Sequence, residues 1–80
     1  MKVRVQLFAV AKELAGRDYV SLDLPEGCTI GQLRARLADD VPSLAAVLPQ
    51  VLFAVGSEYT PDEQAIEGNE VACIPPVSGG

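Results

Sequence analysis

Few side chains in this sequence can act as nucleophiles, bases or metal ligands. The 80 residues include no histidine and only two cysteines, Cys28 and Cys73. Two distant thiols without a histidine do not make a zinc site. Both cysteines lie in apolar stretches, so we expect reduced thiols buried in the core of a cytoplasmic protein. The alternative is a thiol relay at Cys73, which the alternation of its predicted strand disfavours because it turns this side chain inward.

The remaining reactive group is the carboxylate that follows Pro75-Pro76-Val77-Ser78-Gly79-Gly80. Proline cannot donate to a sheet ladder, so strand pairing is expected to stop at Ile74. A proline pair favours an extended polyproline conformation, and six extended residues can reach about 20 Å. The sequence therefore predicts a domain over residues 1–74 and an extended, flexible tail over residues 75–80.

A terminal carboxylate becomes a useful electrophile when one of its oxygens is turned into a leaving group. A mixed anhydride with AMP does this, and the acyl group can then pass to a thiol or sulfide. Gly79 and Gly80 have no Cβ atoms, so they fit a channel too narrow for other residues. We therefore expect Gly80 to carry the reactive group and Gly79 to give access to it. The alternative is an ordinary frayed chain end.

Five short strands and one main helix are expected to hold this tail. Alternating or continuous apolar residues predict strands at 2–7, 19–24, 51–55, 58–60 and 70–74. The main helix begins at a capping box of Thr29 and Gln32, and its apolar stripe contains Ile30, Leu33 and Leu37.

Several connecting segments also have local signals. A short helical segment is predicted at 10–15 with a left-handed stop at Gly16, and a second short helix at 43–48. We expect the strand at 51–55 to be buried on both faces and residues 67–69 to form a hairpin turn.

One long helix covering one face of a sheet is a two-layer α+β arrangement. The order β-β-α-β-β-β is that of the β-grasp, ubiquitin-like fold, with a mixed sheet whose first and last strands are parallel neighbours. Val71 and Cys73 would then face the helix, with Ala72 and Ile74 on the opposite face. By the same alternation Phe8 lies outward beside Ile74, and Tyr59 on the edge strand could extend this apolar patch.

Charge excludes some classes of partner. The net charge of −5 argues against nucleic acid, and no apolar run is long enough to cross a membrane. Residues 1–40 contain all 6 basic residues and 6 of the 11 acidic ones, so the whole excess lies in residues 41–80. It is either a solubilising surface or a means of steering the domain toward a basic partner.

The residues at both ends resemble one family. Leu7-Phe8-Ala9 with Lys12-Glu13-Leu14-Ala15-Gly16 is similar to the N-terminal pattern of the small, ubiquitin-like subunit of molybdopterin synthase. Gly68-Asn69-Glu70-Val71-Ala72 and the ending from Pro75 to Gly80 resemble its C-terminal pattern. The sulfur carrier of thiamine synthesis also ends in Gly-Gly, but it usually lacks Pro-Pro-Val.

This resemblance implies a sulfur carrier in molybdenum cofactor biosynthesis. A ubiquitin-activating-like adenylyltransferase would adenylate Gly80 with ATP and magnesium, and a sulfur donor protein would provide sulfur for a thiocarboxylate. The tail would then enter the large synthase subunit and donate sulfur to cyclic pyranopterin monophosphate, forming the dithiolene. The chain itself would bind no cofactor or metal, and the catalytic groups would belong to the large subunit.

The expected partner-binding residues are those of the patch and the tail: Phe8, Tyr59, Ile74, Pro75, Pro76, Val77 and Ser78. The family often has an aromatic pair before Pro-Pro, whereas this chain has Cys73-Ile74, which reduces the apolar contact area. Three alternatives stay open. They are a carrier for another pathway such as thiamine synthesis, a ubiquitin-like modifier conjugated to lysines through Gly80, and a passive interaction module.

Overall fold

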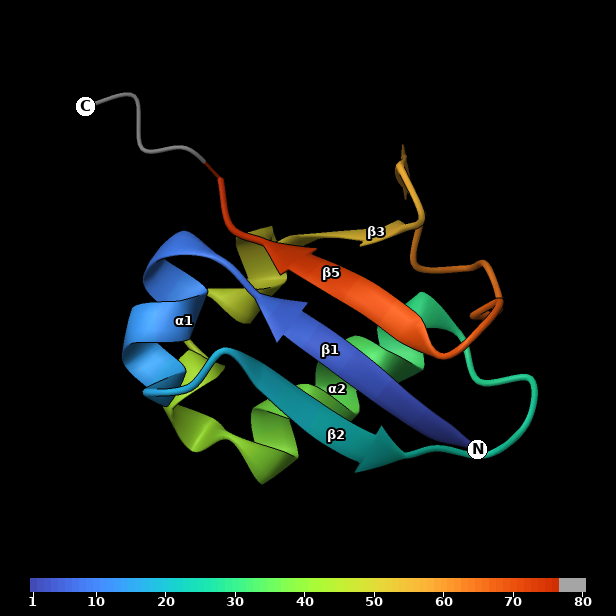
Figure 1. Ribbon diagram of the computed structural model, residues 1–80, viewed down its shortest axis with the longest axis horizontal. Helices are drawn as coiled ribbons and strands as arrows, with labels where there is room; N and C mark the ends of the chain where they lie inside the picture. Colours follow the sequence, from blue (N-terminus) through green and yellow to red (C-terminus); the bar gives the residue numbers. More distant parts are fainter. Residues whose placement is uncertain (77–80) are drawn as a thin grey trace.

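The computed structural model describes residues 1–76, which form a five-stranded sheet with its helices packed on one face and at one end (Figure 1). The strands are β1 (Lys2–Leu7), β2 (Tyr19–Asp23), β3 (Leu52–Val55), β4 (Glu58–Tyr59) and β5 (Glu70–Ile74). Their order in the sheet is β2-β1-β5-β3-β4, with β1 and β5 parallel and the other neighbouring pairs antiparallel. The predicted mixed sheet with parallel first and last strands at its centre is confirmed.

The main helix, α2 (Ile30–Asp40), lies across one face of the sheet (Figure 1). Its capping box is present: the Gln32 N–H donates to the Thr29 hydroxyl, and the Thr29 N–H donates to the Gln32 side chain. Ile30, Leu33 and Leu37 are fully buried. They meet the inward residues of the central strands, and these include Val3, Val5, Val20, Leu22, Val71 and Cys73.

A shorter helix, α1 (Ala9–Ala15), follows β1 directly and stands at the end of the sheet where β1 and β5 finish (Figure 1). It ends as predicted at Gly16, whose φ of 71° is left-handed. Ala9, the first residue of this helix, has a φ of 52°, an uncommon conformation for a residue with a Cβ. The chain therefore makes a tight, strained turn directly after Phe8.

Three sequence predictions need correction. The helix predicted at 43–48 is instead two separate 3₁₀ turns, η1 (Pro42–Leu44) and η2 (Leu48–Gln50). A proline near the start of each turn fixes φ there but removes a donor, and Leu44 and Leu48 insert into the core from separate turns. Residues 68–69 make a bend but do not form a hairpin, because β5 lies between β1 and β3 and does not pair with β4.

The third correction concerns β3, which is not buried on both faces. Phe53 is 1% exposed and faces the core, whereas Leu52 is 52% exposed. The described helices cover only one face of the sheet, so the large side chain of Leu52 on the other face stays accessible, although the small Ala54 beside it is 7% exposed.

Arg34 of α2 ties the helix to the segments on either side of β3. Its Nη1 donates to the carbonyls of Leu48 and Val51, and its guanidinium lies 4.9 Å from the centre of the Phe53 ring. Nε and Nη2 donate to both carboxylate oxygens of Asp62, at 3.2 and 2.8 Å. These hydrogen bonds hold the pKa of the Asp62 carboxyl below its usual range. One side chain thus fixes the entry to β3 and the segment after β4.

Candidate functional site

The outer face of the sheet, opposite α2, is apolar over the half formed by β5, β3 and β4. Leu52 pairs with Ile74, and Ala54 pairs with both Ala72 and Tyr59. Directly opposite residues in a sheet point to the same face, so these five side chains are neighbours. Leu52 and Tyr59 are 52% and 64% exposed, which is unusual for side chains of their size. We call this set, together with Phe8, the apolar patch.

Phe8 joins the patch from the turn between β1 and α1. Its ring is 48% exposed, and its N–H donates to the Cys73 carbonyl at 3.3 Å, which continues the β1–β5 ladder. A shallow open groove of about 370 Å³ runs over the patch. It is lined by Phe8, Ala54, Gly56, Ser57, Tyr59, Ala72 and Ile74. A sheet face of this kind can bind an apolar partner surface but has no group for chemistry.

A second hollow adjoins the groove where the described chain ends. Phe8 and Ile74 line both, and α1 contributes Ala9, Val10, Lys12 and Glu13 to the second, beside Pro75 and Pro76. Pro75 is buried and Pro76 is exposed. The first proline of the predicted tail therefore packs against the domain, and the described chain ends at the exposed Pro76. A partner lying on the patch would meet the C-terminal segment at this point.

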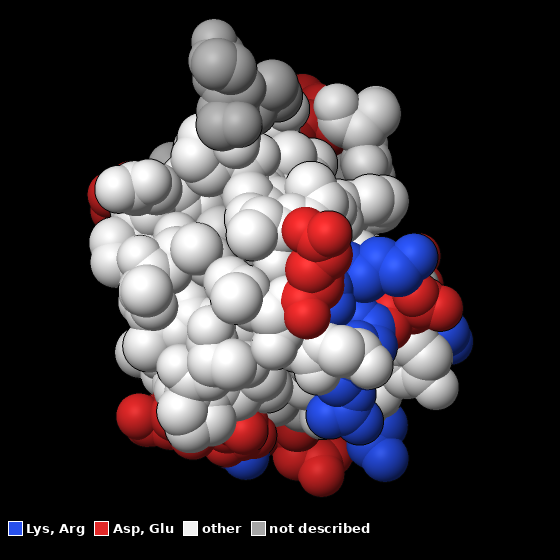
Figure 2. Space-filling model, turned by 90° about the vertical axis from the view of Figure 1, so that its left-hand side faces the viewer, with Lys and Arg blue, Asp and Glu red and all other residues white. Residues whose placement is uncertain are grey.

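Charge is sparse around this exit. Figure 2 shows the face that carries α1, where uncharged side chains cover most of the surface and charged ones gather toward its right and lower margins. Two basic residues of this region are engaged locally. Lys12 pairs with Asp18 at 3.0 Å, and Arg4 lies 3.7 Å from the centre of the Tyr19 ring on the β1–β2 half of the outer face. The outer face is thus divided into an apolar half and a polar half.

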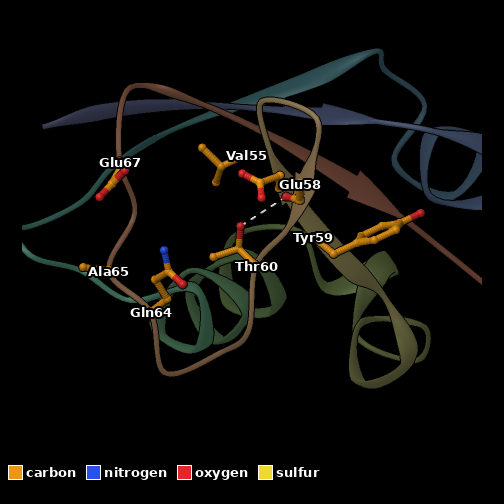
Figure 3. A pocket seen from close by; sticks show the side chains of 7 residues that line it. All are labelled: Val55, Glu58, Tyr59, Thr60, Gln64, Ala65 and Glu67. Atoms are coloured by element: carbon orange, nitrogen blue, oxygen red, sulfur yellow. Dashed lines mark hydrogen bonds between the residues drawn. The ribbon is translucent and has the colours of Figure 1, made fainter.

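Tyr59 separates the patch from a small polar hollow at the outer end of the sheet. Figure 3 shows the other side chains around this hollow, including Glu58, Gln64 and Glu67, while the Tyr59 ring points away from them. The Thr60 hydroxyl donates to the Glu58 carbonyl at 3.3 Å. The hollow contains two carboxylates, and its hydroxyl donates to a backbone carbonyl and not to a carboxylate that could act as its base.

The cysteines are buried as predicted and unpaired with each other. Cys73 is fully buried below the patch, and burial raises the pKa of its thiol to about 11. A thiol with this pKa stays protonated near neutral pH and is a poor nucleophile. Within residues 1–76, no three potential metal ligands come together, and no helix has the length and apolar character needed to cross a bilayer.

The structure brings together Phe8, Tyr59 and Ile74, which come from three separate segments of the sequence. It places Pro75 in a buried position, which leaves Pro76 as the exposed proline. The tail residues Val77, Ser78, Gly79 and Gly80 lie outside the described residues. Sequence reasoning missed Leu52 and Ala54, because the continuous apolar run at 51–55 contains no polar residue to mark which face stays uncovered.

The fold, with an apolar patch beside Pro75 and Pro76, is that of a ubiquitin-like β-grasp domain. The chain belongs to the ThiS family, whose sequence model matches residues 5–80.

Relatives and solved structures agree with this assignment over nearly the whole chain. The molybdopterin synthase sulfur carrier subunit of Arabidopsis thaliana is 38% identical over 81 residues, covering 100% of this chain and 84% of that protein. The protein of the same name from Dictyostelium discoideum is 40% identical, covering 96% of this chain and 94% of its own length. The crystal structure of SAMP1 from Haloferax volcanii has a TM-score of 0.86 at 28% identity and covers 100% of both chains.

Proposed function

We propose that this chain is the sulfur-carrying subunit of a molybdopterin synthase. The observation that carries the proposal is the apolar patch at the exit of a chain that ends in Gly79-Gly80. The curated relatives with this name at 38% and 40% identity support it. The patch would dock on the large synthase subunit, and the terminal carboxylate of Gly80 would carry the sulfur.

Chain length sets the geometry of this docking. Four residues follow Pro76, and a fully extended segment of that length spans at most about 14 Å. The reacting centre of any partner must therefore lie within about this distance of Pro76. Because the patch borders Pro76 directly, a partner surface that covers Phe8 and Ile74 brings its own active site within reach of Gly80.

Charging the tail takes two displacement steps. A carboxylate oxygen of Gly80 attacks the α-phosphate of ATP, and diphosphate leaves with the magnesium that the activating enzyme supplies. Hydrosulfide delivered by a donor protein then attacks the carbonyl carbon, a C–S bond replaces the C–O bond to AMP, AMP leaves, and loss of the proton gives the thiocarboxylate. The sulfur would next pass to cyclic pyranopterin monophosphate in the large subunit. We place the catalytic acids and bases on the partners, since no described group of this chain is arranged for that role.

The decisive experiment charges and then discharges the tail. The chain is incubated with an activating enzyme, ATP, magnesium and a sulfur donor, and its intact mass is measured. We expect an oxygen-to-sulfur increase that maps to Gly80 and disappears when the large subunit and its substrate are added. A chain with one alanine appended after Gly80 should stay uncharged, whereas Ser78→Ala, which leaves Gly79-Gly80 in place, should be charged. Normal sulfur transfer by the extended chain would refute the proposal.

A second function is favoured by one observation. SAMP1 is named a small archaeal modifier protein, and its structure covers this chain completely. In that role the activated Gly80 would form an amide with a lysine of another protein instead of taking up sulfur. Adducts of this chain on lysines, detected by mass spectrometry of a cell lysate, would support this function.

A further inference from the structure

The two edges of the sheet differ in how their backbone groups are satisfied. At the β4 edge the strand has two residues, follows the Gly56-Ser57 turn and is stopped by Pro61. The neighbouring β3 backbone is also satisfied. The Thr60 N–H donates to the Phe53 carbonyl at 2.9 Å, and Arg34 donates to the Val51 carbonyl at 2.7 Å. Short length, proline and such local bonds are the usual protection of a sheet edge.

The other edge is β2, which has five residues and no proline. Met1 and Leu24 exchange two hydrogen bonds, at 2.6 and 2.7 Å, at one end of the β1–β2 pair. In an antiparallel pair such bonded positions alternate, so Leu22 and Val20 also bond to β1. It follows that the N–H and C=O groups of Tyr19, Ser21 and Asp23 point outward.

One side chain confirms this direction. Arg36 of α2 reaches around the edge and donates from Nη1 to the Asp23 carbonyl at 3.1 Å. This contact uses one lone pair of a single carbonyl. The outward groups of Tyr19 and Ser21 remain available to another strand.

We propose that β2 pairs with β2 of a second copy of this chain, antiparallel and with the two-fold axis at Ser21. Ser21 would then face Ser21 of the second copy, and Tyr19 would face Asp23 of the second copy. Each facing pair exchanges two bonds, which gives about six backbone hydrogen bonds in all. The Asp23 carbonyl keeps its bond to Arg36, because a carbonyl oxygen has two lone pairs.

The charge distribution favours a second copy of the chain as the occupant of this edge. All 6 basic residues and 6 acidic ones lie in residues 1–40, so the half that contains β2 is neutral. The sheet order places β2 farthest from β4, where the acidic half begins. Two chains of net charge −5 can therefore join at β2 with their excess charges at opposite ends of the dimer.

Side chains in this register are also complementary. Tyr19 carries the Arg4 guanidinium 3.7 Å from its ring centre, and the facing position holds Asp23 of the second copy. A carboxylate thus meets a tyrosine that is already associated with a cation. The apolar patch lies on β5, β3 and β4, so both copies keep it free. The proposed dimer can therefore be tested separately from the proposed function as a sulfur carrier.

The first test removes one outward N–H. Sedimentation velocity of the full chain, from about 10 µM to about 1 mM, covers the range expected for a weak edge-to-edge contact. We expect reversible dimerisation that weakens more than about tenfold in Ser21→Pro, because proline cannot donate. Ser21→Ala loses the same hydroxyl but keeps the N–H, so it should dimerise as the parent does. A parent that stays monomeric up to about 1 mM, or an unchanged Ser21→Pro dimer, overturns the proposal.

The second test defines the register and does not rely on proline. In a homodimer of Arg4→Glu, the new carboxylate meets Asp23 of the second copy at both ends. In a homodimer of Asp23→Lys, the new ammonium meets Arg4 of the second copy at both ends. Each variant should therefore dimerise less than the parent. A mixture of the two variants restores opposite charges at both ends and should give the heterodimer. Circular dichroism verifies that each variant is folded. If the mixture associates no better than either variant alone, this register is wrong.

Discussion

Replacing Arg34 by methionine removes a guanidinium that serves three segments while it keeps an unbranched, helix-compatible side chain. The Arg34 side chain is only 20% exposed, and the Leu48 and Val51 residues whose carbonyls it satisfies are each 1% exposed. Loss of the donor leaves the Val51 carbonyl without its partner at the start of β3, and leaves the Leu48 carbonyl with only the Val51 N–H, at 3.2 Å. The same change removes the contact with Phe53 and both bonds to Asp62.

The magnitude follows from these contacts. The unpaired Val51 carbonyl and the lost charged hydrogen bond to the Leu48 carbonyl each cost about 1 kcal/mol or more. The cation–π contact contributes about 0.5–1 kcal/mol. The Asp62 side chain is 47% exposed, so solvent screens the ion pair and it adds less than about 1 kcal/mol. We expect a loss of about 3 kcal/mol in the free energy of unfolding. In a domain of this size that lowers Tm by more than about 10 °C.

Urea and thermal unfolding followed by circular dichroism measure this loss. Arg36→Met is the matched control, because Arg36 lies on the same helix but is 43% exposed and pairs with the exposed Asp40. The control should lose less than about 1 kcal/mol. Arg34→Lys should be intermediate, since an ammonium cannot serve two carbonyls and a carboxylate in this fixed geometry. Equal losses in Arg34→Met and Arg36→Met would show that the contacts of Arg34 do not hold the entry to β3.

Three further predictions concern the patch, the thiol and the ion pair. Phe8→Ala should reduce the free energy of unfolding by less than about 1.5 kcal/mol, because about half of Phe8 is already exposed. The same change should weaken binding of the large subunit by about 2 kcal/mol, roughly thirtyfold. Urea unfolding measures the first effect and titration calorimetry the second, and a larger effect on folding than on binding would make Phe8 a core residue. The pKa of the Cys73 thiol is raised to about 11, so iodoacetamide should not label this thiol in the folded chain near pH 8 but should label it in urea. Rapid labelling of Cys73 in the folded chain would contradict its burial. The pKa of Asp62 is lowered in the folded state, so the stabilising effect of its carboxylate is complete above about pH 4 and is lost as the pH falls through the lowered value. Below about pH 4 the free energy of unfolding of the parent should therefore fall more steeply than that of Asp62→Asn. Parallel curves for the two proteins would show that the Arg34–Asp62 pair does not stabilise the fold.

Local sequence patterns determined most of the secondary structure. Strict alternation places Val3 and Val5 inward in β1, and the capping box at Thr29 starts α2 where it was predicted. Such signals depend on residues that are close together in the sequence, so they can be recognised before the fold is known. The same patterns failed for the segment 43–48, where Leu44 and Leu48 enter the core from separate 3₁₀ turns.

Local sequence patterns predicted only part of the candidate site. The alternation of β1, continued to Phe8, and that of β5 predicted Phe8 and Ile74 as outward neighbours, and both line the groove together with Tyr59. Leu52 was assigned to the interior because a continuous apolar run indicates a strand covered on both faces. Among residues 1–76 no helix covers the outer face, and the exposure of Leu52 depends on this lack of cover, which the residues of β3 do not encode.

The sequence by itself determined a β-grasp order of elements, a neutral and an acidic half, and an ending in Pro-Pro-Val-Ser-Gly-Gly. Only the tertiary structure decided that β5 inserts between β1 and β3, that Arg34 binds segments 14 to 28 residues away, and that β2 keeps an unprotected edge. The physical reason is the range of the interactions. Periodicity and capping act between near neighbours in the chain, whereas strand order and edge exposure follow from how the whole chain buries its apolar faces together.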